Sequence, residues 1–235
     1  YGVHVRCLVA IPLFIFAEAA LHKAMLRFVP QFVEGGVVPP AERARFEQLL
    51  AGVRQLRNTS LPWIFMLGVA LAWSIGTSAE PHSDAMAWAV EPDGGMGFGG
   101  WWFAYVARPV FLALLMGWLW RLGLVTLWMA RVGRLKLSLV PTHPDHVGGL
   151  GFLEKLPGAF SMLSFALSAV LASRWAHDVV HHGATLGSLK LPMIGFVVLW
   201  SLLLLAPLLA LVPALATAKR AALVAYSNLV GEQGR

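Results

Sequence analysis

The 235-residue sequence has few charged residues and a single cysteine. Charged residues make up 13% of the chain, and Cys7 is its one thiol. One thiol excludes an intrachain disulfide and a metal site built from several cysteines. A hydrophobic content of 58% and a mean hydropathy of +0.69 exclude an ordinary soluble globular domain. The composition is typical of a polytopic membrane protein.

Acidic residues are scarcer than basic ones. The chain has 12 Asp and Glu against 18 Lys and Arg, which gives a net charge of +6. The basic residues lie beside apolar runs, where they orient a membrane protein and attract anionic lipid headgroups. We therefore predict the lipid bilayer as the partner of these residues and no nucleic-acid partner.

Five stretches are long and apolar enough, or nearly so, to cross a bilayer, which takes about 20 residues of helix. They are residues 5–21, 61–78, 101–130, 159–173 and 191–214. The sequence predicts an all-α polytopic helical membrane protein with five visible transmembrane spans, forming a single domain over residues 1–235. Because the chain begins without Met and enters an apolar run at once, we expect it to be a fragment of a longer protein.

The charges of the connections predict which side of the membrane each connection occupies. Residues 23–60 carry six Lys and Arg and read as cytoplasmic, whereas residues 76–100 carry four acidic residues, no basic ones, and read as external. Apolar residues from Phe46 to Leu56 recur at helical spacing after Ala41, which predicts an amphipathic cytoplasmic helix. The N-terminus is expected outside and the C-terminus inside.

Glu18 and His22 lie four residues apart in the first span and so share one helix face. An ionisable group at membrane depth is by default a candidate functional residue, and it normally has a partner. The candidate partners are Arg121, which is expected toward the same end of the third span, and His143 or His146. Two interpretations stay open: an ion path or proton-transfer site, and an ion pair that joins two helices.

The stretch 139–154, LVPTHPDHVGGLGFLE, combines prolines, histidines, an aspartate and glycines between apolar runs. One interpretation is structural: the prolines end the preceding helix, Asp145 caps the next segment of the chain, and the glycines permit tight turns. The other is a polar site in a cytoplasmic loop, made by His143, Asp145 and His146 with Gly148 and Gly149.

A divalent metal is one ligand that such a site could take, because imidazole and carboxylate oxygen suit it. His143 and Asp145 are too few to bind a metal by themselves, so this hypothesis adds Glu18 and His22 as ligands. No cofactor motif accompanies them.

The histidine-rich run 177–182 and Arg108 are both expected to face polar surroundings outside the hydrocarbon core. The run HDVVHH, with His177, His181 and His182, is expected on an external connection as a solvated, pH-sensitive surface. Arg108, near the outer end of the third span, is expected to snorkel outward.

Several segments together resemble a known family: AIPLFIFAEAALH in the first span, LRN at 56–58, GWW at 100–102 and RLKLSLVPTHPDHVGGLGFL. The chain resembles a family of uncharacterised multi-pass bacterial inner-membrane proteins with a PTHPDxxGGLGFL motif, over most of residues 3–160. In that family the position of His146 is often Arg, which argues against a metal role there. The resemblance implies a bacterial inner-membrane location and supplies no activity.

Ionisable residues at membrane depth, without a recognisable nucleophile or cofactor motif, favour a homo-oligomeric ion channel or transporter over an enzyme. Its polar site is expected near the cytoplasmic end of the first and third spans. A metal-dependent membrane enzyme and a structural partner in an envelope complex are the alternatives.

Overall fold

The computed structural model describes residues 2–78, 95–140 and 142–233, and all of the regular structure in these ranges is helical. The all-α prediction is confirmed. Most of the predicted external connection at 76–100 falls on residues 79–94, which lie outside the described residues.

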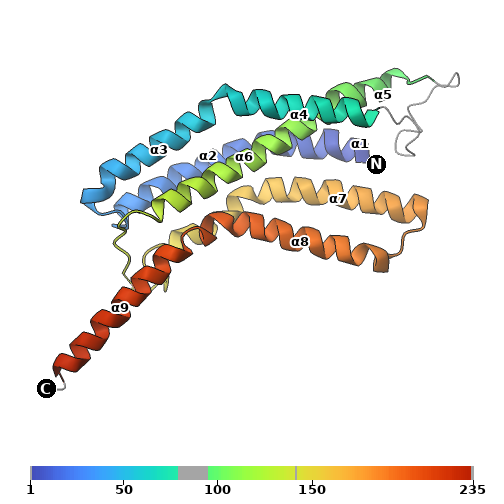
Figure 1. The fold of residues 1–235 in the computed structure, drawn as a ribbon. Coiled ribbons are helices and arrows are strands. Elements are labelled where there is room, and N and C mark those ends of the chain that lie inside the picture. The colour runs from blue at the N-terminus through green and yellow to red at the C-terminus, as the bar shows by residue number, and fades with distance from the viewer. Residues whose placement is uncertain (1, 79–94, 141, 234–235) are drawn as a thin grey trace. The chain divides into compact units, whose positions relative to one another are not determined.

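The helices follow one another along the chain in the order of the colours in Figure 1. They are α1 Gly2–His4, α2 Ile11–Glu34, α3 Arg43–Asn58, α4 Ser60–Ser78, α5 Phe98–Trp102, α6 Arg108–Val132, α7 Ser161–His182, α8 Leu186–Leu209 and α9 Val212–Gln233. Two π-helical segments of the described residues, η1 Val5–Ala10 and η4 Phe103–Ala107, precede α2 and α6. The 3₁₀ segments in the same ranges are η2 Pro40–Glu42, η5 Gly151–Lys155 and η6 Pro157–Phe160.

Five helical runs in the described residues are long and apolar enough to span a membrane, which confirms the predicted number of spans. They are Gly2–Glu34, Pro40–Gly76, Phe98–Val132, Gly151–His182 and Leu186–Leu209.

Several boundaries differ from the sequence prediction. The helix of the first span continues to Glu34, and α7 extends through His182, so HDVVHH is helical. The predicted span 191–214 is divided, because α8 ends at Leu209 and α9 begins at Val212. Pro213 contributes to this break, since it has no N–H to donate to the carbonyl of Leu209 and its ring crowds the preceding turn.

The described residues pack into two compact units. Unit 1 comprises Tyr1–Ala17, Asn58–Arg121 and Met162–Pro192, and unit 2 comprises Glu18–Arg57, Leu122–Ser161 and Met193–Arg235. Helices α2, α6 and α8 contribute residues to both units. The assignment of residues 1–235 to a single domain stays a prediction.

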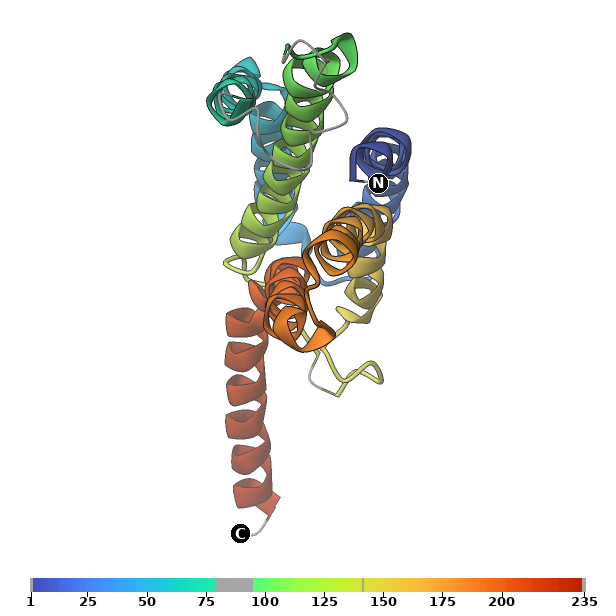
Figure 2. The same cartoon turned by 90° about the vertical axis from the view of Figure 1, so that its right-hand side faces the viewer.

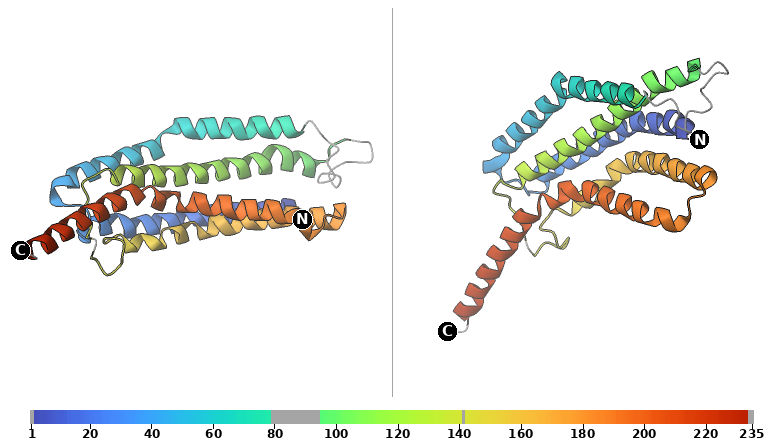
Figure 3. Two further views of the ribbon diagram at one scale, coloured as in Figure 1. Left: turned by 60° about the horizontal axis from the view of Figure 1, so that its bottom comes forward. Right: turned by 45° about the vertical axis from the view of Figure 1, so that its right-hand side comes forward.

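Unit 2 is built around the fully buried ring of Phe32 on α2. Its centroid lies 5.7 Å from that of Phe46 on α3, 5.4 Å from Trp128 on α6 and 5.0 Å from Phe152 on η5. Figures 1 and 3 show α3 and the second half of α6 running beside the second half of α2. Phe46 is 2% exposed, so the amphipathic helix predicted after Ala41 exists and buries its apolar face here.

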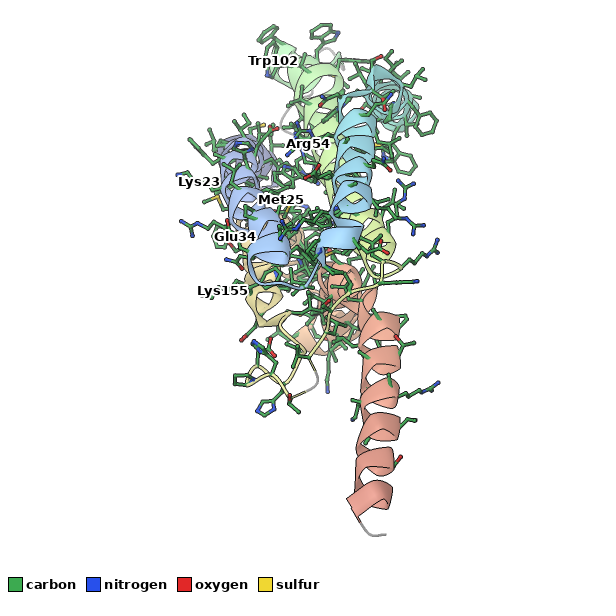
Figure 4. All side chains as sticks on the ribbon, turned by 90° about the vertical axis from the view of Figure 1, so that its left-hand side faces the viewer. Lys23, Met25, Glu34, Arg54, Trp102 and Lys155 are labelled. Atoms are coloured by element: carbon green, nitrogen blue, oxygen red, sulfur yellow. The ribbon has the colours of Figure 1, made fainter. Side chains whose placement is uncertain are left out.

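The surface of unit 2 is basic. Lys23 on α2 and Arg54 on α3 are exposed, and both are labelled in Figure 4. Twelve described Lys and Arg residues belong to unit 2 and five to unit 1, an asymmetry that follows the positive-inside pattern.

Helix α9 adds two of these cations, Lys219 and Arg220, and both are exposed. Leu211, just before the helix, is 2% exposed, whereas Leu223 and Val224 are 61% and 60% exposed. Figure 2 shows α9 running away from the other helices of unit 2.

Unit 1 joins the first and third spans through a buried indole. Trp118 on α6 has no exposed surface, and its Nε1–H donates to the carbonyl oxygen of Phe14 on α2 at 3.0 Å. The rings of Phe14 and Phe111 stack with centroids 5.6 Å apart. On α4, the Trp63 ring lies where a Cβ on Gly117 of α6 would meet it at 2.8 Å, so this glycine lets the ring approach the α6 backbone.

Removing the central ring of unit 2 tests this account. Phe32→Ala is expected to lower the free energy of unfolding by about 3–5 kcal/mol, because it leaves a cavity among three aromatic rings. The measurement is denaturant or thermal unfolding of the purified protein in detergent. Phe16→Ala is the matched control, since Phe16 lies on the same helix but is 65% exposed. Equal losses in the two variants would contradict the central role of Phe32.

Candidate functional site

Two π-helical turns mark the start of the first and third spans. In η1 the N–H of Ile11 donates to the carbonyl of Arg6, and at the end of η4 the N–H of Arg108 donates to the carbonyl of Phe103. Each bond spans five residues, and each is followed directly by a proline, Pro12 or Pro109. Because proline cannot donate the regular helical bond and its ring crowds the preceding turn, a widened turn accommodates it. Such π-turns are frequent at functional sites.

The two π-turns meet over Phe103, which is 4% exposed and packs with Ala107, Val3 and Cys7. The guanidinium carbon of Arg6 lies 5.9 Å from the centre of the Phe103 ring, and that of Arg108 lies 5.6 Å from it. Both arginines are half-buried. Charged side chains from two candidate spans therefore converge on one ring.

The ring attracts both cations but does not neutralise them. A cation–π contact contributes about 0.5–2 kcal/mol, depending on how far it is withdrawn from water. Two guanidinium groups that share one ring are at most about 12 Å apart, and at that distance like charges repel by about 1.4 kcal/mol at an effective dielectric constant near 20. Repulsion and stacking are comparable, so the ring holds the arginines without removing their positive charge.

A third arginine, Arg174, belongs to the same region of unit 1 and is itself paired with an acidic side chain. Arg174 on α7 acts electrostatically on Arg6 with the same sign as Arg108. Its Nε lies 3.4 Å from Oδ1 of Asp178, one helical turn along α7. The start of α1 lies beside α7, since a Cβ on Gly2 would come within 3.9 Å of the Ser173 hydroxyl oxygen. Three candidate spans thus contribute an arginine to one region of unit 1.

Arg121 is also covered by aromatic rings. Its guanidinium carbon lies 5.5 Å from the Trp63 ring centre and 5.1 Å from that of Trp118. Arg121 belongs to unit 1 and its predicted partner Glu18 to unit 2, so the pairing of the two stays a prediction.

Glu18 and His22 lie one turn apart on α2, and both side chains are exposed. Their predicted common face is therefore present on the surface of unit 2. Their role in an ion path or an ion pair stays a prediction.

The loop between α6 and η5 is organised by the carboxylate of Asp145. Its Oδ1 accepts the backbone N–H of Val147 at 3.0 Å, and its two oxygens accept that of Gly149 at 3.1 and 2.9 Å. Its Oδ2 also accepts the N–H of Gly151 at 2.8 Å, and the Nδ1 of His143 lies 2.8 Å from Oδ1. This arrangement supports the interpretation in which Asp145 caps the segment after it.

The glycines of the loop are required by this geometry. Gly149 has a φ of +96°, which side-chain-bearing residues rarely adopt, and a Cβ on Gly151 would meet the Asp145 side chain at 3.0–3.1 Å. His146 is exposed and has a φ of +58°, a left-handed conformation that only a few per cent of non-glycine residues adopt. The backbone N–H of Ser138 donates to the carbonyl of Val37 at 2.9 Å and ties the loop to the connection between α2 and α3.

The loop prolines do not end the helix before them. Helix α6 stops at Val132, before Pro144, and Pro141 lies outside the described residues. Residues 133–140, which follow α6, are not helical. The prediction that these prolines terminate the third span is wrong.

These hydrogen bonds shift the acidity of Asp145. Partial desolvation alone would raise the pKa of its carboxyl, but the N–H groups of Gly149, Gly151 and Val147 and the imidazole of His143 outweigh it and hold the pKa well below its usual value. The carboxylate is therefore ionised throughout the physiological range.

The predicted metal ligands are only partly brought together. His143 and Asp145 are in contact, but in the described part of the chain no three His, Cys, Asp or Glu side chains are grouped so that they could hold a metal ion. The rings of His181 and His182 lie 4.6 and 5.4 Å from that of His177 at the end of α7. A metal bound by Glu18, His22, His143 and Asp145 stays a prediction.

Arg6 and Phe103 were not identified from the sequence, and Arg108 was assigned only a snorkelling role. A sequence pattern common to both could have indicated them, because Arg6 and Phe103 each lie six positions before a proline inside an apolar run. A mean hydropathy does not register the spacing to a proline. The sequence of one span also does not indicate which residue of another span its side chains contact.

Replacing the carboxylate of the loop tests its structural role. Asp145→Asn is expected to increase amide hydrogen exchange at Val147, Gly149 and Gly151, because one acceptor oxygen becomes an NH₂ group facing these donors. Exchange is measured by mass spectrometry on the purified protein. His146→Gly is the matched control in the same loop and should preserve protection, since glycine adopts a positive φ without strain. Unchanged exchange in Asp145→Asn would contradict the assignment.

The lowered pKa of Asp145 predicts how the loop responds to acid. A carboxylate whose pKa is depressed by folding stabilises the folded loop fully above its unfolded pKa of about 3.9, and this contribution is lost as the pH falls below that value. Protection factors at Gly149 and Gly151, corrected for intrinsic exchange, should stay constant from pH 7 to about pH 4.5 and fall below about pH 3.9. A loss centred near neutral pH would contradict this prediction.

Comparisons of the chain with protein-family models, with curated proteins and with solved structures found no match.

Proposed function

We propose that the chain is a multi-pass ion channel or transporter whose first and third spans, Gly2–Glu34 and Phe98–Val132, carry the ionisable residues that the ion meets. The meeting of Arg6 and Arg108 over Phe103 carries this proposal. Charged side chains within membrane-spanning helices are energetically expensive, so they are by default candidates for an ion or substrate pathway.

Hydrophobic packing does not require a charged side chain at either position. Leucine or methionine at either position would cover the Phe103 ring without placing like charges near each other. Arg121, held by Trp63 and Trp118 in the third span, is a further cation at depth. Repeated placement of arginines inside apolar helices, each supported by aromatic rings, fits a protein that handles charge in the membrane.

The exposed pair of ionisable residues supports an oligomer. Glu18 and His22 are exposed on α2 within a candidate span, where an outward face would meet hydrocarbon. A face of this kind is better placed against a second copy of the chain or along an aqueous path. The polar site near the cytoplasmic end of the first and third spans, comprising Glu18, His22 and Arg121, belongs to this proposal.

The bacterial inner membrane is the proposed location. The resemblance to multi-pass inner-membrane proteins supports it, and the basic surface of unit 2 supports a cytoplasmic position for that unit. The Asp145 loop would then lie at the cytoplasmic end of the path.

Ion flux in proteoliposomes tests the proposal. The purified chain should move at least one of protons, cations or anions across liposomes, measured with pH- and potential-sensitive dyes and with radiolabelled anions. Glu18→Gln should change the rate by about tenfold, as expected when a charge along an ion path is removed. Glu47→Gln, which removes an exposed carboxylate from α3, should leave the rate unchanged.

Liposomes without protein give the leak rate. No flux of any of these ions above the leak, together with identical behaviour of Glu18→Gln and the original chain, would reject the channel or transporter assignment.

A further inference from the structure

We propose that His177 and His181, at the end of α7, form a binding site for a divalent transition-metal ion of the Ni²⁺ or Cu²⁺ class. The site goes beyond the proposed transport function and does not depend on it, because its test measures binding and not flux. It gives a chemical role to the histidine-rich run 177–182, which the proposed ion path does not use.

The two imidazoles lie on one face of the helix. His177 and His181 are four residues apart on α7, a spacing that places side chains one above the other. Their ring centres are 4.6 Å apart, with an angle of 43° between the ring planes. His177 is half-buried and His181 is exposed, so an ion in solution can reach the pair. Two histidines at this spacing on a helix are a recurring metal-binding arrangement.

The separation of the rings fits a single chelated ion. An imidazole nitrogen lies about 2.0–2.1 Å from a bound metal, which places the ring centre roughly 3.2 Å from the ion. Two rings on one ion are then about 4.5–5.2 Å apart, for angles at the metal from about 90° to the tetrahedral value. The observed 4.6 Å lies near the 90° end of this range. Square-planar and tetragonal geometry, with angles near 90°, is typical of Cu²⁺ and Ni²⁺.

The type of ligand selects the same class of ion. Imidazole nitrogen suits copper, nickel and zinc, whereas Mg²⁺ and Ca²⁺ take oxygen ligands. The carboxylate of Asp178 pairs with Arg174, with 3.4 Å between Oδ1 and Nε, so it is not counted as a ligand. The site therefore has two protein ligands, and water completes the coordination. Two ligands agree with the described part of the chain, in which no three His, Cys, Asp or Glu side chains are grouped to hold an ion.

The end of α7 favours a cation and holds the pair in place. The last carbonyl groups of a helix carry partial negative charge, which attracts cations. After His182 the chain turns at Gly183, whose φ is +62°, and the N–H of Ala184 donates to the carbonyl of Asp178 at 3.1 Å. This bond closes the last turn around His181. The ligands are therefore positioned before an ion arrives, which lowers the entropic cost of binding.

The binding test uses the untagged full chain in a non-ionic detergent, freed of metal with a chelator and titrated by calorimetry with Ni²⁺ in a non-coordinating buffer. One ion per chain is expected to bind. His177→Ala and His181→Ala should each weaken Ni²⁺ binding by about tenfold or more, because chelation by two linked ligands becomes binding by one. An excess of Mg²⁺ should not compete, since it takes oxygen ligands.

His146→Gly is the matched control. It removes one exposed imidazole from a position with no histidine four residues away, and it should leave Ni²⁺ affinity unchanged. The paramagnetic resonance spectrum of bound Cu²⁺ should show coupling to two nitrogens in the original chain and in this control, and to one fewer in His181→Ala.

Amide exchange separates the loss of a ligand from a loss of folding. Ni²⁺ should slow exchange over residues 178–183, because an ion that binds the folded turn stabilises it. His181 is exposed, so His181→Ala should keep the exchange pattern of the metal-free chain and lose only this effect of Ni²⁺.

Ni²⁺ binding that is absent from the original chain, or that is unaffected by His177→Ala and His181→Ala, overturns the site. Binding that is lost in His143→Ala but kept in both α7 variants also overturns it and assigns the ion to the Asp145 loop. Ion flux from a chain that binds no Ni²⁺ overturns this site and leaves the transport proposal standing. Histidine-dependent Ni²⁺ binding in a chain that moves no ion supports the site and rejects transport.

Discussion

An arginine inside an apolar helix has to be stabilised by something other than bulk water, and in this chain aromatic rings supply that stabilisation. Phe103 supports Arg6 and Arg108, and two tryptophans cover Arg121. Each ring is itself fixed by packing between spans. The packing of the spans in unit 1 therefore also determines where its arginines are held.

The prolines near the start of the first and third spans accompany the widened turns that hold this arrangement. A proline near the start of a span would ordinarily bend it, but Pro12 and Pro109 each come directly after a turn widened to a five-residue hydrogen bond. The widened turns carry the cluster around Phe103. The irregular backbone is accommodated where helices are packed together, which is where a membrane tolerates departures from regular helical bonding.

The all-α class and the number of helical runs able to span a membrane could be predicted from the sequence, because length and apolar content alone decide whether a helix can cross a bilayer. Helix ends could not, because packing sets them. Helix α2 continues past the apolar run to Glu34, since Phe28 and Phe32 are buried beyond Glu18 and His22. The capping role of Asp145 was readable from its neighbours, but its donors at Gly149 and Gly151 depend on the folded path of the loop. Arg6 was missed because its significance lies in Phe103, nearly a hundred positions away, and no pattern within one span indicates that contact.

The approach of Trp63 to Gly117 links the packing of α4 against α6 to the surroundings of Arg121. The indole of Trp63 occupies the space beside α6 that any larger residue at position 117 would fill. A larger residue at position 117 would displace the Trp63 ring, which is one of the two indoles that cover Arg121.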